Sequence, residues 1–314
     1  MRMNTIKRNI TLVVIILTVA GGCKEGENTS PNTPPGGTGS GNGSSNKEQV
    51  LMDYQDVYLA NFINPSLSVW EDGDLANCNA GSISAATNQK VLTLINYYRK
   101  LVGLPGTVTF EATRNQKCQE AAFMMTANNA LNHQPPSSWN CYTANGAEGA
   151  LRSNLAWGHT TAGLFSQMRD DGSGNYFAGH RRLILSPKGN VFGHGSTNKH
   201  MALWVIDSKS AANAPEFIAW PPQGFCPSAF NFKRWSFSVV GGANYENAVV
   251  SIKDVNGNNI DLSMENFLTG FGEDTIVWVP QGVQNDMEYT ITISNVEVNG
   301  KTETYTYKTT LVSV

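Results

Sequence analysis

Residues 179–195 read GHRRLILSPKGNVFGHG. A glycine, a histidine and two arginines open this stretch, and a short β-type run closes it. In that run, Gly193 and Gly195 alternate with larger residues. The run is bounded by turn-forming residues on its N-terminal side, which is typical of one short strand in a sheet.

On either side of this stretch, the spacing of apolar residues predicts helices first and strands later. Apolar residues recur every three or four positions after Ser84, a plausible helix cap, until Gly103 and Pro105 stop the pattern. Helices interleaved with strands that pair largely as hairpins predict a layered α+β sandwich. The predicted helices cover about residues 85–102, a segment ending near Leu131, and about residues 160–168; the predicted strands are 191–195, 201–206 and 217–220.

After Pro227 only β-type runs remain. The pairs Asn256-Gly257 and Asn299-Gly300 are strong signals for hairpin turns. About ninety residues of this kind predict an immunoglobulin- or fibronectin-like β-sandwich. A fold of this type carries no function by itself, so a spacer or packing role is favoured. The runs are 235–240, 248–254, 275–279, 289–293 and 302–308.

Composition narrows the class of protein. Hydrophobic residues make up 40% of the 314 residues and charged residues 15%, which disfavours disorder over most of the chain. The formal net charge of −3 gives no electrostatic reason to expect nucleic acid as a partner. The length allows two modest domains.

Two further motifs precede the Gly-His-Arg-Arg segment along the chain. Leu131-Asn132-His133 ends the second predicted helix, and Ser153-Asn154-Leu155-Ala156 follows it. Together with the Gly-His-Arg-Arg segment, they resemble the CAP superfamily, which comprises cysteine-rich secretory proteins, antigen 5 and pathogenesis-related 1 proteins and is defined by the SCP domain. The resemblance covers roughly residues 85–221 and implies a three-layer α/β/α sandwich, followed here by the all-β sandwich.

The same resemblance implies a site. In this family two histidines and two acidic residues line one cleft, and some members bind a divalent metal there. His133 and His180 occupy the histidine positions, Ser153 stands where the first Glu usually lies, and Asp170 or Asp171 is left for the second acid. Two histidines with at most one carboxylate predict no cofactor or a weakly bound metal such as zinc. The alternative is that both histidines simply hydrogen-bond to neighbours.

We expect the cleft to bind a small molecule, lipid or glycan. Arg181 offers planar, charged donors to an anionic group on such a ligand, although buried structural pairing is the more frequent use of such a residue. His194 is included because it lies in the glycine-rich strand. The expected ligand-binding residues are His133, Ser153, Asn154, Asp170, Asp171, His180, Arg181 and His194.

Two other functions remain open. A hydrolase acting on peptide or glycan would use Ser153 as nucleophile, with His133 or His180 as its base. The residues around Ser153 contain no nucleophile-elbow pattern, so binding is favoured over catalysis. The third alternative is a structural scaffold at the cell surface.

The N-terminus predicts export. A basic start and an apolar run lead to Ala20-Gly21-Gly22-Cys23, which resembles a bacterial lipobox in which Cys23 is acylated. We therefore expect an exported lipoprotein of the bacterial cell envelope, held at the outer membrane or cell surface by its lipid anchor. The expected segments are a signal peptide at 1–23, a flexible tether rich in Gly, Ser, Asn and Pro at 24–50, a CAP domain at 51–226 and a β-sandwich at 227–314.

Four cysteines follow Cys23, and they allow three pairings. Disulfides are expected in an exported chain. The sequence does not choose among the pairings; we expect Cys78 with Cys141, and Cys118 with Cys226.

Overall fold

The computed structural model describes residues 46–207 and 213–314. Its first helix, α1 (Lys47–Asp53), begins after Asn46, whose side chain accepts a hydrogen bond from the Gln49 N–H. This start lies within the last residues of the expected tether. The expected signal peptide and Cys23 lie outside the described residues. Of the helices in the described ranges, none has the length and apolar character needed to cross a membrane.

Within the described ranges, five α-helices follow the short π-helix η1 (Tyr54–Leu59). Ser84 caps the first of them, as expected, by accepting a hydrogen bond from Thr87 N–H. The second ends at Asn128, earlier than predicted, because Asn129 adopts a left-handed conformation that stops the helix. The five are α2 (Ala85–Leu101), α3 (Ala112–Asn128), α4 (Ala144–Arg152), α5 (Thr160–Arg169) and α6 (Gly179–Ile184).

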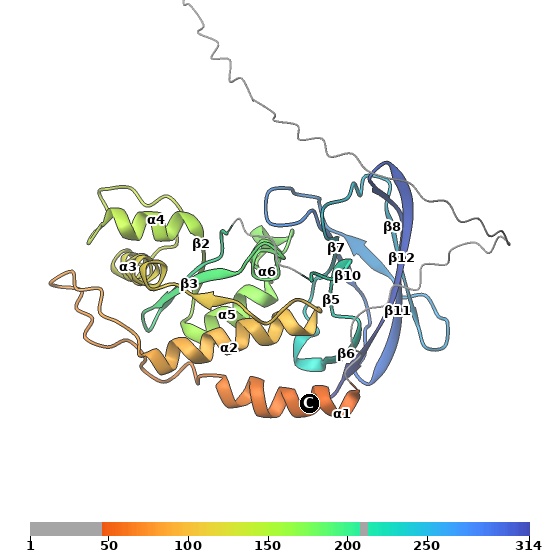
Figure 1. Ribbon diagram of the computed structural model, residues 1–314, viewed down its shortest axis with the longest axis horizontal. Helices are drawn as coiled ribbons and strands as arrows, with labels where there is room; N and C mark the ends of the chain where they lie inside the picture. Colours follow the sequence, from red (N-terminus) through yellow and green to blue (C-terminus); the bar gives the residue numbers. More distant parts are fainter. Residues whose placement is uncertain (1–45, 208–212) are drawn as a thin grey trace, which may run out of the picture. The chain divides into compact units, whose positions relative to one another are not determined.

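The first sheet has the strand order β1-β3-β4-β2. Alternating side chains send Leu155 and Ala202 into a core with α3 and α4, and Ala156 and Leu203 into a core with α2 and α5. Figure 1 shows the sheet between these two helix layers, which confirms the α/β/α sandwich. The strands are β1 (Thr109–Phe110), β2 (Ser153–Trp157), β3 (Val191–Ser196) and β4 (His200–Trp204).

The C-terminal strands form two more sheets, with orders β5-β7-β10-β9 and β6-β12-β11-β8. Their inner faces meet through aromatic pairs such as Trp235–Tyr289 and Phe237–Tyr305. The expected mixed α+β fold with a β-sandwich is therefore confirmed. The strands are β5 (Phe217–Trp220), β6 (Gly224–Pro227), β7 (Trp235–Val239), β8 (Val249–Asp254), β9 (Leu262–Met264), β10 (Ile276–Pro280), β11 (Met287–Val298) and β12 (Lys301–Val312).

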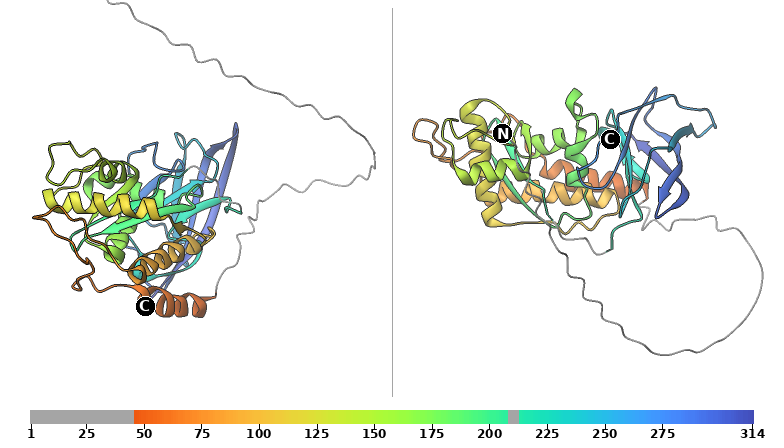
Figure 2. Two further views of the ribbon diagram at one scale, coloured as in Figure 1. Left: turned by 60° about the vertical axis from the view of Figure 1, so that its left-hand side comes forward. Right: turned by 90° about the horizontal axis from the view of Figure 1, so that it is seen from above.

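The two parts share strands and core. β5 and the first three residues of β6 lie before residue 227, within the expected CAP domain, but these strands pair with β7 and β12. Phe230 packs edge-on against Tyr58 and Tyr98, so one buried aromatic cluster joins the N-terminal helices to the β part. Both views in Figure 2 show the N-terminal helix (red-orange) running beside α2. The described residues belong to one compact unit.

One of the two expected disulfides is present. Cys78 is bonded to Cys141, which confirms that pairing. The expected Cys118–Cys226 bond is wrong, because both thiols are free and buried. Cys118 belongs to the core between α3 and the first sheet, whereas Cys226 on β6 belongs to the other core cluster. Burial raises the pKa of the Cys118 thiol to about 12, so this cysteine acts as an apolar packing residue.

Candidate functional site

The central feature of the site is a hydrogen-bonded pair formed by His180 and Asp170. Nδ1 of His180 lies 2.7 Å from Oδ1 of Asp170. The carboxylate is fully buried, whereas the histidine side chain is 23% exposed. Asp170 therefore fixes the orientation of the ring. Among residues 46–207 and 213–314, no hydrogen bond to the other ring nitrogen, Nε2, is formed, so this atom can bind an external partner.

Local backbone structure places these two residues together. Asp170 ends α5 in a left-handed conformation (φ 55°), which Asp tolerates better than most residues. Its second oxygen, Oδ2, accepts the backbone N–H of His180 at 2.9 Å, at the start of α6. A carboxylate is favourable there because the first N–H groups of a helix have no partner within it. One side chain thus caps α6 and orients the histidine.

Asn154 and Ser153 lie on opposite faces of the first sheet. Asn154 is buried on the α5/α6 side, and its Nδ2 donates to the His180 carbonyl at 3.0 Å. Ser153 is buried on the α3 side, with its hydroxyl 3.5 Å from Sγ of Cys118. Of the two neighbours, only Asn154 supports the His180 site directly.

His133 is exposed in the loop after α3. Its Nδ1 lies 3.1 Å from the carbonyl oxygen of Ala150 in α4, so the ring donates there. Asn154 follows Ala150 by four residues along the chain. His133 and His180 are thus hydrogen-bonded to the two ends of the segment 150–154. That their side chains lie close together stays a prediction.

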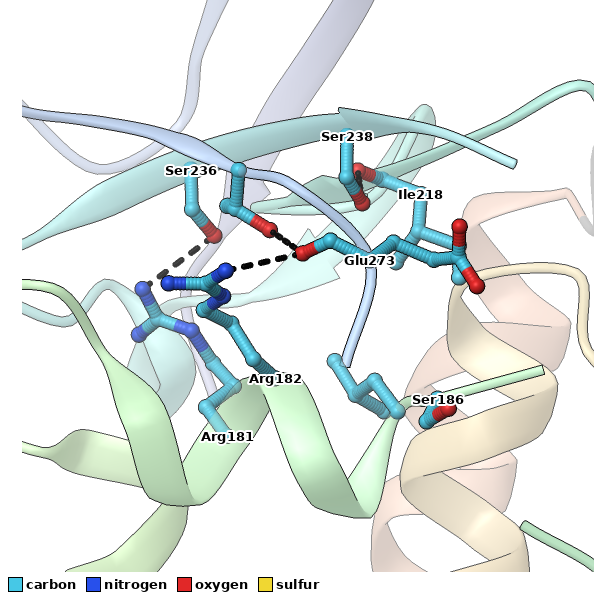
Figure 3. Close-up of a pocket in the computed structure, with 9 residues that line it drawn as sticks. Arg181, Arg182, Ser186, Ile218, Ser236, Ser238 and Glu273 are labelled. Atoms are coloured by element: carbon cyan, nitrogen blue, oxygen red, sulfur yellow. Dashed lines mark hydrogen bonds between the residues drawn. The ribbon is translucent and has the colours of Figure 1, made fainter. Parts of the chain in front are cut away.

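The remaining expected residues have structural partners. Asp171 pairs with Arg169 rather than His180, with 2.7 Å between Oδ2 and Nε. Arg181 is buried and donates to backbone carbonyls and to Ser236 (Figure 3). Burial lowers the pKa of Arg181 to about 10, which leaves it charged at neutral pH. His194 is buried, stacks on Phe110 and bonds to Asn88 of α2.

A family model supplies the identification. Residues 92–200 match the model described as the cysteine-rich secretory protein family, CAP. This segment is a CAP domain. The match includes the three motifs and both residues of the His180–Asp170 pair. No curated protein matches the chain.

The CAP domain offers a partial shell for a metal ion. His180 is oriented by a carboxylate, as zinc-binding histidines commonly are, and His133 has one ring nitrogen bonded to a carbonyl. Zinc sites need at least three protein ligands. Across residues 46–207 and 213–314, no group of three or more His, Cys, Asp or Glu side chains is arranged to hold a metal. The described residues therefore do not fit a complete zinc site, and we derive no chemistry through a metal.

One residue beside this site, Arg234, belongs to none of the sequence motifs. Arg234 lies outside the CAP domain, just before β7, and its Nη1 donates to the Asp170 carbonyl at 2.8 Å. Its side chain is buried. Arg234 follows Asp170 by 64 residues and belongs to no motif, so no sequence signal pointed to it.

Proposed function

We propose that this protein is an exported, membrane-anchored binding protein whose CAP domain takes a small polar or lipidic ligand at the His180–Asp170 pair. The observation that carries this proposal is the partly exposed His180 ring, oriented through Nδ1 by a buried carboxylate. A polar group fixed in this way can hydrogen-bond to a ligand without first losing side-chain freedom. His133 is proposed as a second contact, and zinc as at most a weak occupant.

Binding is favoured over hydrolysis by the packing of Ser153. A nucleophilic serine needs a base within hydrogen-bond reach and a third group to orient that base. The Ser153 hydroxyl instead lies beside the Cys118 thiol. In the described part of the chain, no histidine hydrogen-bonds to it. A hydrolase would need another nucleophile, such as a water molecule activated by His180.

The test is a thermal-shift screen of the soluble part with fatty acids, sterols and short glycans. A ligand at about 100 times its Kd adds about 2.7 kcal/mol to the free energy of unfolding, which is a clear rise in Tm. We expect Asp170→Asn to reduce the shift strongly, since it removes the charge that orients His180. Asp171→Asn is the matched control and should leave the shift intact.

Other outcomes would point elsewhere. Turnover of fluorogenic ester, peptide or glycan substrates that is lost in His180→Ala would favour the hydrolase. Absence of both a shift and turnover over the whole panel would favour a scaffold role.

The anchor is tested separately, on the full chain. If Cys23 is acylated, the protein should partition into the detergent phase of a Triton X-114 separation. Cys23→Ser should move most of it to the aqueous phase. Equal partitioning of the two proteins would contradict the lipoprotein proposal.

A further inference from the structure

Arg234, which lies in the C-terminal β-sandwich part of the chain, contacts Asp170 of the His180–Asp170 pair. Its Nη1 donates to the backbone carbonyl of Asp170 at 2.8 Å and to that of Gly172 at 3.3 Å. Its Nε lies 2.7 Å from Oε1 of Glu265, which holds the guanidinium in place. The Arg234 side chain is 4% exposed. A rigid, multiply bonded arginine therefore fixes the chain on both sides of Asp171.

Arg181, next to His180 in sequence, donates hydrogen bonds from the CAP domain to the C-terminal β-sandwich part. Its Nη2 donates to the Arg234 carbonyl at 2.9 Å and to the Ser236 hydroxyl at 3.2 Å. Its Nη1 donates to Met168 near the end of α5 at 3.3 Å. Figure 3 shows Arg181 pointing from α6 to Ser236 on β7. These bonds explain why an arginine in the motif is buried rather than presented to a ligand.

The contacts form a closed cycle. Asp170 accepts from His180 through its carboxylate and from Arg234 through its carbonyl, and Arg234 in turn accepts from Arg181. Arg182 extends the same interface to Leu268 and Glu273 without touching Asp170. A small pocket of about 20 Å³ lies beside Arg181 and Arg182.

We infer that Arg234 is a positioning residue of the CAP-domain site, and that the C-terminal β part is a working component of that site. The physical reason lies at Asp170. This residue has an unfavourable left-handed backbone, and its carboxylate sets the His180 ring, so a small shift of its carbonyl moves the histidine. Arg234 prevents that shift. The inference rests on the proposed function only for its effect on ligand affinity.

The experiment follows the Nδ1–H proton of His180 by NMR in the full folded chain. A proton shared with a buried carboxylate at 2.7 Å should give a resolved downfield signal in the wild type. We expect Arg234→Gln to lose or broaden this signal and to weaken affinity for any ligand found in the screen about tenfold. Arg234→Lys, which keeps one charged donor, should restore part of both.

The control is Arg182→Gln, which removes bonds from the same interface but none to Asp170. If both variants lose the signal equally, the effect is general loosening and the inference is overturned. An unchanged signal in Arg234→Gln overturns it as well. If Arg234→Gln does not fold, the Lys variant decides by the same signal. The NMR results are independent of the ligand screen, whose failure would affect the proposed function alone.

Discussion

Replacement of Gly195 by alanine should destabilise the protein by about 3 kcal/mol or more. A Cβ atom at this position would lie 2.0 Å from the Gln119 backbone nitrogen and 2.3 Å from the Cys118 carbonyl carbon. Both atoms belong to the backbone of α3, so no side-chain rotation can relieve the overlap. Either α3 moves away from β3, or the strand distorts. Each choice opens the core that holds Cys118 and Ala122.

Urea denaturation of the wild type and the variant measures this loss. Gly174→Ala is the matched control, because a Cβ there would meet nothing within 4 Å, and its loss should stay within about 0.5 kcal/mol. A loss below about 1 kcal/mol for Gly195→Ala would show that α3 and β3 pack less closely than described. Gly193 faces α3 in the same way, with its Cβ position 2.6 Å from the Arg114 carbonyl carbon.

Stability should fall steeply between pH 7.5 and pH 5 because of two buried histidines. Burial lowers the pKa of His194 to about 3. Burial, with the nearby Lys199 charge, lowers the pKa of His200 to about 4. In the unfolded chain both rings have the ordinary pKa of about 6.5. As the pH drops through that value, the two histidines bind protons in the unfolded state but not in the folded state. The free energy of unfolding therefore falls.

Each histidine should cost about 2 kcal/mol between pH 7.5 and pH 5, or about 4 kcal/mol together. Urea unfolding at several pH values in this window measures the sum. His194→Gln and His200→Gln should each be less stable at pH 7.5, but each should flatten the pH dependence by about one proton. Slopes equal to that of the wild type in both variants would show that these rings take up protons at about the same pH in the folded and the unfolded protein.

The sequence points to His180 and leaves two candidates for its acidic partner, while the closeness of His133 to His180 stays a prediction. Three ordered motifs point to His180, and the sequence leaves Asp170 and Asp171 as candidates for the acid beside it; in the structure Asp170 is the residue that bonds to His180. The choice between the two depended on where α5 ends, because a change of one residue in register turns a side chain from the core to the surface. Ser153 was placed with the histidines by motif position alone, but the pleat of β2 turns its side chain toward Cys118.

Local sequence pattern is enough to predict the α+β class, the capped helix after Ser84 and the hairpin at Asn299-Gly300. These features depend on residue spacing and turn chemistry, which a linear sequence records. Three features follow from the tertiary structure alone: Cys118 and Cys226 are not bonded, Arg181 is buried, and Arg234 donates a hydrogen bond to the Asp170 carbonyl. Those outcomes depend on contacts between residues that lie far apart in the chain. The pattern of neighbouring residues does not show which of these distant surfaces pack together.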